Sequence, residues 1–184
     1  MALEPGELPV RHSGDIGSHN ARPIYAVWEL TLHCDQPCQH CGSRAGAQRT
    51  DELSTDEVLE VASALAELGC REVALIGGEA YLRKDLPIII RHLADSGIRV
   101  VMQTGGRAFS PERAKALRAA GLTGLGVSID GPRAIHDELR GNAGSYDAAM
   151  RALVNARDAG MVISAHTQIN RLNHRRLRPR SATR

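Results

Sequence analysis

The chain has 184 residues, of which 42% are hydrophobic, so it can bury the core of a domain of ordinary size. It has no run of about 18 apolar residues and no basic-then-apolar leader, which predicts a cytoplasmic protein without a membrane span. The net charge of +2 is unevenly distributed, because residues 1–170 carry 17 basic and 21 acidic side chains. The acidic body argues against a nucleic-acid-binding function.

Three regions are expected from the pattern of residues. Residues 1–23 have no apolar periodicity and are predicted to form an extended arm, while residues 171–184 form a basic, irregular tail with six arginines. Between them, residues 24–170 alternate β-rich and amphipathic helical segments. Strands are expected at 24–32, 72–76, 98–103, 125–129 and 161–168, and four helices at 55–68, 85–95, 111–120 and 146–159.

The ends of these helices carry recognisable signals. Ser54 and Glu57 have the spacing of a capping box, and Ser110 followed by Pro111 is a typical helix start. A glycine follows each predicted helix, where a left-handed residue satisfies the last carbonyl groups. These glycines are Gly69, Gly97, Gly121 and Gly160.

Alternating strands and helices predict an α/β fold with a parallel sheet, either doubly wound or a partial (βα) barrel. In both architectures the chemistry lies in loops that follow the carboxyl ends of the strands. The polar motifs of this chain fall in those loops. They are the cysteines after the first strand, Gly77-Gly78-Glu79 after the second, Thr104 after the third, and Ser128 with Asp130 after the fourth.

Three of the four cysteines, Cys34, Cys38 and Cys41, form a C-x3-C-x2-C loop. Three thiolates on so short a loop can bind three corners of a [4Fe-4S] cluster and leave one iron open to another ligand. A structural zinc ion is the alternative, with His33 or His40 as its fourth ligand. Cys70 is far from the other three in sequence and is expected to be a small buried residue.

The cysteine spacing and the Gly77-Gly78-Glu79 run resemble the signature motifs of the radical S-adenosylmethionine (radical SAM) enzymes, over about residues 25–170. This resemblance implies a partial TIM-like barrel, a [4Fe-4S] cluster on Cys34, Cys38 and Cys41, and S-adenosylmethionine chelated to the open iron. It also implies an external electron donor such as flavodoxin or ferredoxin. In that family, reductive cleavage of S-adenosylmethionine gives a 5′-deoxyadenosyl radical that abstracts hydrogen from a substrate.

The same resemblance implies roles for individual residues in binding S-adenosylmethionine. Glu79 is expected to accept from the methionine ammonium, with Gly77 and Gly78 allowing close approach of the backbone. The ring of His40 is expected beside the adenine, and Arg140 on the methionine carboxylate. Thr104, Ser128 and Asp130 are the expected ribose contacts, and Gln168 and Asn170 are candidates for more distant ones.

Peptide-modifying and haem-forming members of the family share the residues after the cluster and the run around Arg140, so a peptide or a tetrapyrrole substrate is expected. The apolar pattern is lost after Asn170, which suggests a barrel truncated after its fifth strand. Two alternatives to a complete enzyme stay open. One is an inactive fragment that binds cluster and cofactor without turnover, and the other is a zinc-stabilised, non-catalytic binding module.

Overall fold

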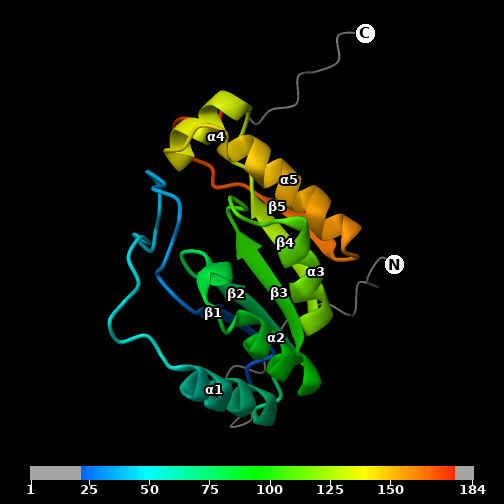
Figure 1. Cartoon of the computed structure of the whole chain (residues 1–184). Helices are drawn as coiled ribbons and strands as arrows, with labels where there is room; N and C mark the ends of the chain where they lie inside the picture. Colours follow the sequence, from blue (N-terminus) through cyan, green and yellow to red (C-terminus); the bar gives the residue numbers. More distant parts are fainter. Residues whose placement is uncertain (1–21, 177–184) are drawn as a thin grey trace, which may run out of the picture.

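The sheet of this domain has five parallel strands that lie side by side in chain order (Figure 1). The computed structural model describes residues 22–176. The strands are β1 (Tyr25–Glu29), β2 (Glu72–Ile76), β3 (Arg99–Thr104), β4 (Leu122–Ser128) and β5 (Val162–His166). A doubly wound sheet reverses its strand order at a switch point, whereas this order runs in one direction. The fold is therefore α/β, a partial TIM-like barrel whose sheet is not closed, as predicted.

Five helices and one 3-10 turn connect the strands. They are α1 (Thr55–Glu67), η2 (Ala80–Leu82), α2 (Leu86–Asp95), α3 (Pro111–Ala120), α4 (Arg133–Arg140) and α5 (Ser145–Asp158). Helix α1 contacts α2, α2 contacts α3, and α3 contacts α5, so these helices form one layer beside the sheet. Within residues 22–176, no helix is long and apolar enough to cross a membrane.

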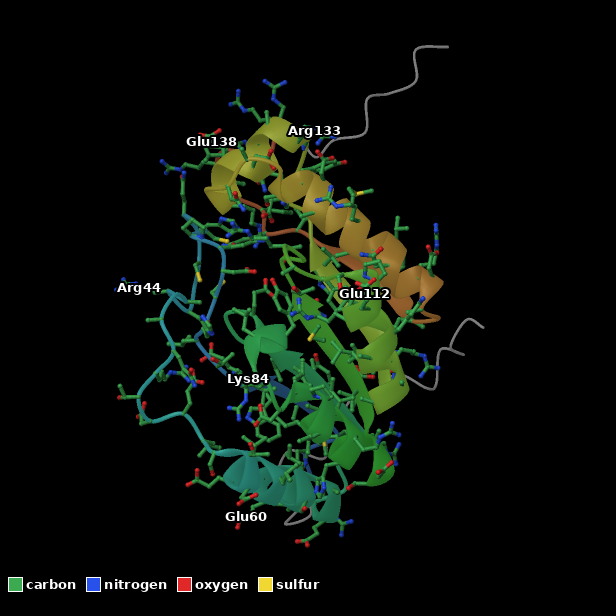
Figure 2. The ribbon with its side chains drawn as sticks, viewed as in Figure 1. Arg44, Glu60, Lys84, Glu112, Arg133 and Glu138 are labelled. Carbon is green, nitrogen blue, oxygen red and sulfur yellow. The ribbon has the colours of Figure 1, made fainter. Side chains whose placement is uncertain are left out.

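The core lies between this helix layer and one face of the sheet. Ile89 and Ile90 of α2 belong to the same buried cluster as Val100 and Met102 of β3, and all four side chains are fully buried. Charged side chains such as Glu60, Glu112 and Arg133 lie at the periphery of the molecule (Figure 2). Burial of the apolar helix faces is what holds the strand ends, and the loops after them, in place.

The predicted helix ends are confirmed. Ser54 Oγ accepts from the Glu57 N–H at 3.4 Å, and the Glu57 carboxylate accepts from the Ser54 N–H at 2.8 Å. Ser110 Oγ accepts from the Arg113 N–H, with Pro111 as the first helical residue. The glycines at 69, 97, 121 and 160 all have positive φ angles, as residues that end helices do.

The expectation of four helices is wrong, because α4 follows β4 directly. Its sequence, RAIHDELR, is short and mostly polar, and its N-cap residue, Pro132, makes no side-chain hydrogen bond, so the usual signals of a helix are missing. Gly141, at φ 62°, ends the helix in the left-handed conformation. Strand β4 also begins at Leu122, three residues before the predicted start, because Gly124 and Gly126 interrupt its apolar pattern.

The face of the sheet opposite the helix layer is open in part. The pairing register places five small or branched residues in one row across all strands: Val27, Ala74, Val101, Gly124 and Val162. Val27 at one edge is 56% exposed and Val162 at the other is 66% exposed. Every residue of β5 is exposed, so this edge strand forms an uncovered apolar and polar surface.

Residues 171–176, predicted to belong to the tail, contact the domain through Asn173. This side chain is fully buried, and its Nδ2 donates to the carbonyl oxygens of Asp130 at 2.9 Å and Gln168 at 2.6 Å. The segment therefore packs against the loop that follows β4. Residues 1–21 of the predicted arm and 177–184 of the predicted tail lie outside the described residues.

Candidate cluster and cofactor site

The cysteine loop, residues 30–54, joins β1 to α1 and is held by its own hydrogen bonds. Glu52 Oε1 accepts from Thr31 Oγ1 and from the Leu32 N–H, both at 2.8 Å. The Cys34 N–H donates to the Gly46 carbonyl at 3.0 Å, and the Gly46 N–H donates to the Leu32 carbonyl at 2.9 Å. These bonds fold the loop back on itself and fix the position at which the first cysteine leaves the strand.

The three sulfur atoms of this loop are free thiols, and each lies near an N–H donor. The Gln36 N–H lies 3.4 Å from Cys34 Sγ, and the Ala45 N–H lies 3.3 Å from Cys41 Sγ. Arg140 Nη1 lies 3.7 Å from Cys38 Sγ. Hydrogen bonds of this kind stabilise thiolates that ligate metal clusters.

Burial raises the pKa of the Cys34 thiol to about 11. The pKa of Cys38 is also raised by burial, against the opposing effect of the Arg140 charge. Both thiols are therefore protonated at neutral pH in the metal-free chain. Ligation must release those protons, because the metal binds the thiolate form. The positive charge of the metal group then has to stabilise thiolates that burial disfavours.

The spacing of the sulfur atoms bears on the choice between zinc and a cluster. Among residues 22–176, one set of three ligating groups has its atoms within 4.8 Å of one another, Cys34, Asp35 and Glu79, so the three sulfurs are spread more widely. Tetrahedral zinc holds its sulfur ligands roughly 3.8 Å apart. The ring of His40 is also engaged at both nitrogens, at 3.2 Å from the Leu139 carbonyl and 3.3 Å from Asp130. The donor set fits a larger group than one zinc ion.

Glu79 follows β2 and is 2% exposed. Its carboxylate accepts from Thr104 Oγ1 at 2.5 Å and from the Gly105 N–H at 2.7 Å. Burial raises the pKa of Glu79 to about 7, although both hydrogen bonds act to lower it. The Thr104 hydroxyl, which is itself buried, therefore faces this carboxylate.

Gly77 and Gly78 let the end of β2 run against the cysteine loop. A Cβ at Gly77 would lie 2.4 Å from the Thr31 carbonyl oxygen, and one at Gly78 would lie 2.4 Å from the His33 carbonyl oxygen. The N–H groups of Gly78 and Glu79 donate to the same two oxygens at 2.7 Å. The atoms that lie too close for a side chain at Gly77 or Gly78 therefore belong to the backbone of the cysteine loop.

Asp130 lies at the centre of a buried polar cluster. Its Oδ2 accepts from Arg140 Nε at 2.9 Å and Nη2 at 2.7 Å, and lies 3.3 Å from His40 Nε2. Its Oδ1 accepts from the Gln168 N–H at 3.2 Å. The Asp130 side chain is fully buried, and its carboxylate holds the side chains of Arg140 and His40. Both of these side chains line the cavity.

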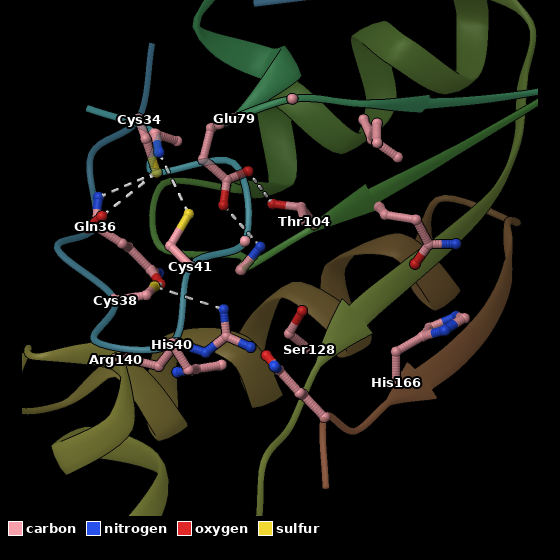
Figure 3. Close-up of a pocket in the computed structure, with 18 of the residues that line it drawn as sticks. Cys34, Gln36, Cys38, His40, Cys41, Glu79, Thr104, Ser128, Arg140 and His166 are labelled. Atoms are coloured by element: carbon pink, nitrogen blue, oxygen red, sulfur yellow. Dashed lines mark hydrogen bonds between the residues drawn. The ribbon is translucent and has the colours of Figure 1, made fainter. Parts of the chain in front are cut away.

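The opposite wall of the cavity comes from β3, β4 and β5, and Figure 3 shows Ser128 and His166 there, across from the cysteines. Gly126 leaves space for two side chains, since a Cβ on it would lie 1.9 Å from Gln103 Oε1 and 2.6 Å from His166 Nε2. His166 Nε2 lies 2.9 Å from Ser164 Oγ. This wall offers hydrogen-bonding groups that are open to solvent.

The eleven residues expected to bind the cluster or S-adenosylmethionine line one cavity of about 400 Å³, whereas His33, the other candidate zinc ligand, does not line it. They are Cys34, Cys38, His40, Cys41, Gly77, Gly78, Glu79, Thr104, Ser128, Asp130 and Arg140. Gln168 also lines it, and Asn170 does not. Sequence reasoning missed Gln36, Gln103 and His166, although the alternation of β3 and the position of His166 at a strand end were usable signals for the last two.

Cys70 is the small buried residue that the sequence predicts, and Tyr81 joins two of the loops near the cavity. The Tyr81 hydroxyl donates to Asp35 Oδ2 at 2.9 Å, so this buried ring holds the loop after β2 against the cysteine loop. Burial raises the pKa of Tyr81. Cys70 is buried in the core cluster, away from the cavity.

Several curated proteins are similar to this chain. Fe-coproporphyrin III synthase of Methanosarcina barkeri is 36% identical over 159 residues, which cover 86% of this chain and 40% of that protein. The AdoMet-dependent heme synthase of Nitratidesulfovibrio vulgaris is 34% identical over 149 residues, which cover 80% of this chain and 41% of that protein. Mycofactocin maturase MftC of Mycolicibacterium smegmatis is 34% identical over 139 residues, which cover 75% of this chain and 35% of that protein. The chain thus spans about two fifths of the length of these relatives.

Solved structures share the fold at low sequence identity. Streptococcus suis SuiB bound to S-adenosylmethionine superposes with a TM-score of 0.69 at 15% identity, over 79% of this chain and 34% of SuiB. BtrN in complex with AdoMet and 2-DOIA gives a TM-score of 0.59 at 16% identity, over 79% of this chain and 58% of BtrN. Residues 28–174 match the radical SAM superfamily, and the chain belongs to that superfamily.

Proposed function

We propose that this domain binds a [4Fe-4S] cluster through Cys34, Cys38 and Cys41 and S-adenosylmethionine in the adjoining cavity, as part of a hydrogen-abstracting enzyme. When both are bound, an electron from the cluster cleaves the sulfonium to methionine and a 5′-deoxyadenosyl radical, which takes a hydrogen atom from the substrate. A flavodoxin or ferredoxin is the proposed electron donor. The zinc-binding module is disfavoured by the spread of the sulfurs.

One observation carries this proposal: three free thiols, a buried carboxylate and a guanidinium converge on a single cavity at the carboxyl ends of the strands. An amino acid zwitterion needs an acceptor for its ammonium group and a donor for its carboxylate. Glu79 and Arg140 supply these two groups. Their buried setting strengthens both interactions, because few water molecules compete for them.

The contacts within the chain suggest how the remaining residues act. Arg140 already gives Nε and Nη2 to Asp130, which leaves Nη1 as the group to donate into the cavity. Asp130 and Thr104 would then work by positioning Arg140 and Glu79, while Ser128 is the more direct ribose contact. The half-buried ring of His40 is held at both nitrogens and offers its face to the adenine.

A tetrapyrrole is the proposed substrate of the whole protein. Two of the relatives described above are named for haem or coproporphyrin chemistry. Val27 and Val162 also expose apolar side chains at the two edges of the sheet, while Ala74 between them is buried. A peptide substrate, which the maturase relative suggests, is the outcome that would contradict this choice.

The test is anaerobic reconstitution with iron and sulfide, followed by reduction in the presence of S-adenosylmethionine and measurement of 5′-deoxyadenosine. We expect a brown protein that forms 5′-deoxyadenosine, and loss of both properties in Cys38→Ala. Cys70→Ala is the matched control, because its thiol is buried outside the cavity and should leave both unchanged.

Three other results would correct the proposal in different ways. A colourless protein with one tightly bound zinc ion would contradict it. Cluster uptake and cofactor binding without 5′-deoxyadenosine would support the inactive-fragment alternative. Quenching of tryptophan fluorescence on titration with a peptide, but not with iron coproporphyrin, would overturn the choice of substrate.

A further inference from the structure

We propose that the side-chain amide of Gln36 donates a hydrogen bond to the Cys38 sulfur when the cluster is bound, and thereby raises the reduction potential of the cluster. This inference rests on the proposed function, since it concerns the cluster that the cysteine loop would hold. It gives Gln36, which lies between the first two cysteines, a positioning and tuning role.

Gln36 is a buried amide with an unpaired donor. Its side chain is 4% exposed, and its Nε2 has no hydrogen-bond partner. Its Oε1 lies 3.6 Å from Cys38 Sγ and accepts from that thiol. An unpaired buried N–H group is unfavourable, so a residue in this position is expected to gain a partner in the functional state.

The amide is also confined by the loop that follows β3. A Cβ on Gly105 would lie 2.8 Å from Gln36 Oε1 and 2.9 Å from Glu79 Oε1, so the amide packs directly on the Gly105 backbone. The amide therefore lies between the cluster loop and the buried carboxylate. Figure 3 shows the Gln36 side chain extending from the loop toward Cys38.

Cluster binding changes what Cys38 needs from this amide. A thiol donates to Oε1, but a metal-bound thiolate has no proton and can only accept. Rotation of the amide about its last torsion exchanges Oε1 and Nε2, which turns the unpaired donor toward the sulfur. The thiolate then accepts from two side chains, Gln36 and Arg140, whose Nη1 is already 3.7 Å away.

Donation to a cluster sulfur withdraws electron density from it and favours the reduced state. Removal of the amide in Gln36→Leu should therefore make the cluster harder to reduce. We expect the ratio of reduced to oxidised cluster at a fixed potential to fall about threefold, or about 28 mV for a one-electron couple.

The experiment is a redox titration of the reconstituted full chain, monitored by electron paramagnetic resonance in the absence of S-adenosylmethionine. Gln39→Leu is the matched control, because Gln39 lies in the same loop with its side chain exposed. Its midpoint potential should equal that of the parent chain, while Gln36→Leu should shift to a more negative value at equal iron content.

An unchanged midpoint potential in Gln36→Leu would overturn the inference and leave the proposed function intact. Failure of the parent chain to form a [4Fe-4S] cluster would overturn both. If Gln36→Leu does not take up iron, a chain with Gln39→Leu, Gln48→Leu, Gln103→Leu and Gln168→Leu, labelled with 15N at its remaining glutamine side chain, gives a second readout. Electron spin echo modulation from 15N at its reduced cluster would support the hydrogen bond, and absence of that coupling would contradict it.

Discussion

The two walls of the cavity differ in how firmly the chain holds them. On the wall formed by the cysteine loop, α4 and the loops after β2 and β4, polar side chains such as Glu79, Gln36 and Asp130 are at least 96% buried, and each contacts another side chain of the site. On the other wall, every residue of β5 is exposed, and His166 contacts Ser164 of its own strand. The chain therefore builds a rigid cofactor wall and leaves the proposed substrate wall open.

Replacement of Asp130 should have the largest effect, because the cofactor wall depends on it. Asp130→Asn removes the charge that faces Arg140, whose side chain is 12% exposed, and leaves that cation buried without a counter-ion. Breaking a buried ion pair in this way costs about 3–5 kcal/mol. Urea unfolding should show a loss of that size.

Asp158→Asn is the control for this prediction. Asp158 pairs with Arg157 on the surface, where both side chains are about 60% exposed, and the change should cost less than about 1 kcal/mol. Equal losses in the two variants would show that the cofactor wall is no more tightly constrained than the surface.

A pair of glycine substitutions compares the two walls directly. The new methyl group of Gly105→Ala meets Gln36 and Glu79, which are buried and cannot move aside, so overpacking should cost about 1–3 kcal/mol. In Gly126→Ala it meets the far ends of Gln103 and His166, which can swing toward solvent, so the cost should stay below about 1 kcal/mol. Thermal unfolding measures both, and the reverse order would contradict the distinction.

Acid should weaken the cofactor wall through His136 of α4, a smaller effect of definite sign. Burial lowers the pKa of His136, helped by the nearby positive charge of Arg140 and opposed by Asp130 and Asp137, while His40 adds a further lowering effect. Its Nδ1 accepts from the Asp130 N–H at 3.1 Å, which requires the neutral ring.

As the pH falls through about 6.5, the unfolded chain takes up a proton at His136 before the folded chain does. The contribution of His136 to the free energy of unfolding should therefore be constant above about pH 7 and decline below about pH 6.5. Urea midpoints at several pH values test this, and His136→Asn should flatten the decline. A stability that rises as the pH falls through this range would contradict it.

The alternation of strands and helices, the helix ends and the loops that carry the chemistry could be predicted because they depend on local signals. The capping box of Ser54 and Glu57 can be recognised within four residues of sequence. The carboxyl ends of parallel strands lie at one edge of the sheet, which predicts that Cys34, Glu79 and Ser128 lie together without knowledge of the packing. Helix α4 was missed because it has only eight, mostly polar residues and no side-chain cap at its start. Its stability comes from tertiary contacts.

The partners of the site residues could not be predicted for the same reason. Thr104, which is expected to contact a ribose, donates to Glu79, 25 residues away. Asp130, which is assigned a similar contact, binds Arg140 and His40. Such pairings depend on rotamers and burial, which follow from the packing of distant segments rather than from the spacing of a motif.

The contact between the cysteine loop and α4 has a consequence for the order of folding. The Gln39 N–H donates to the Leu139 carbonyl at 2.9 Å, and Cys38 meets Arg140 across 102 positions of sequence. During synthesis the three cysteines emerge about a hundred residues before the helix that completes their surroundings. The site is therefore completed only after β4 and α4 have been synthesised. A nascent chain that encountered iron before that point would lack the contacts of the cysteine loop with Leu139 and Arg140.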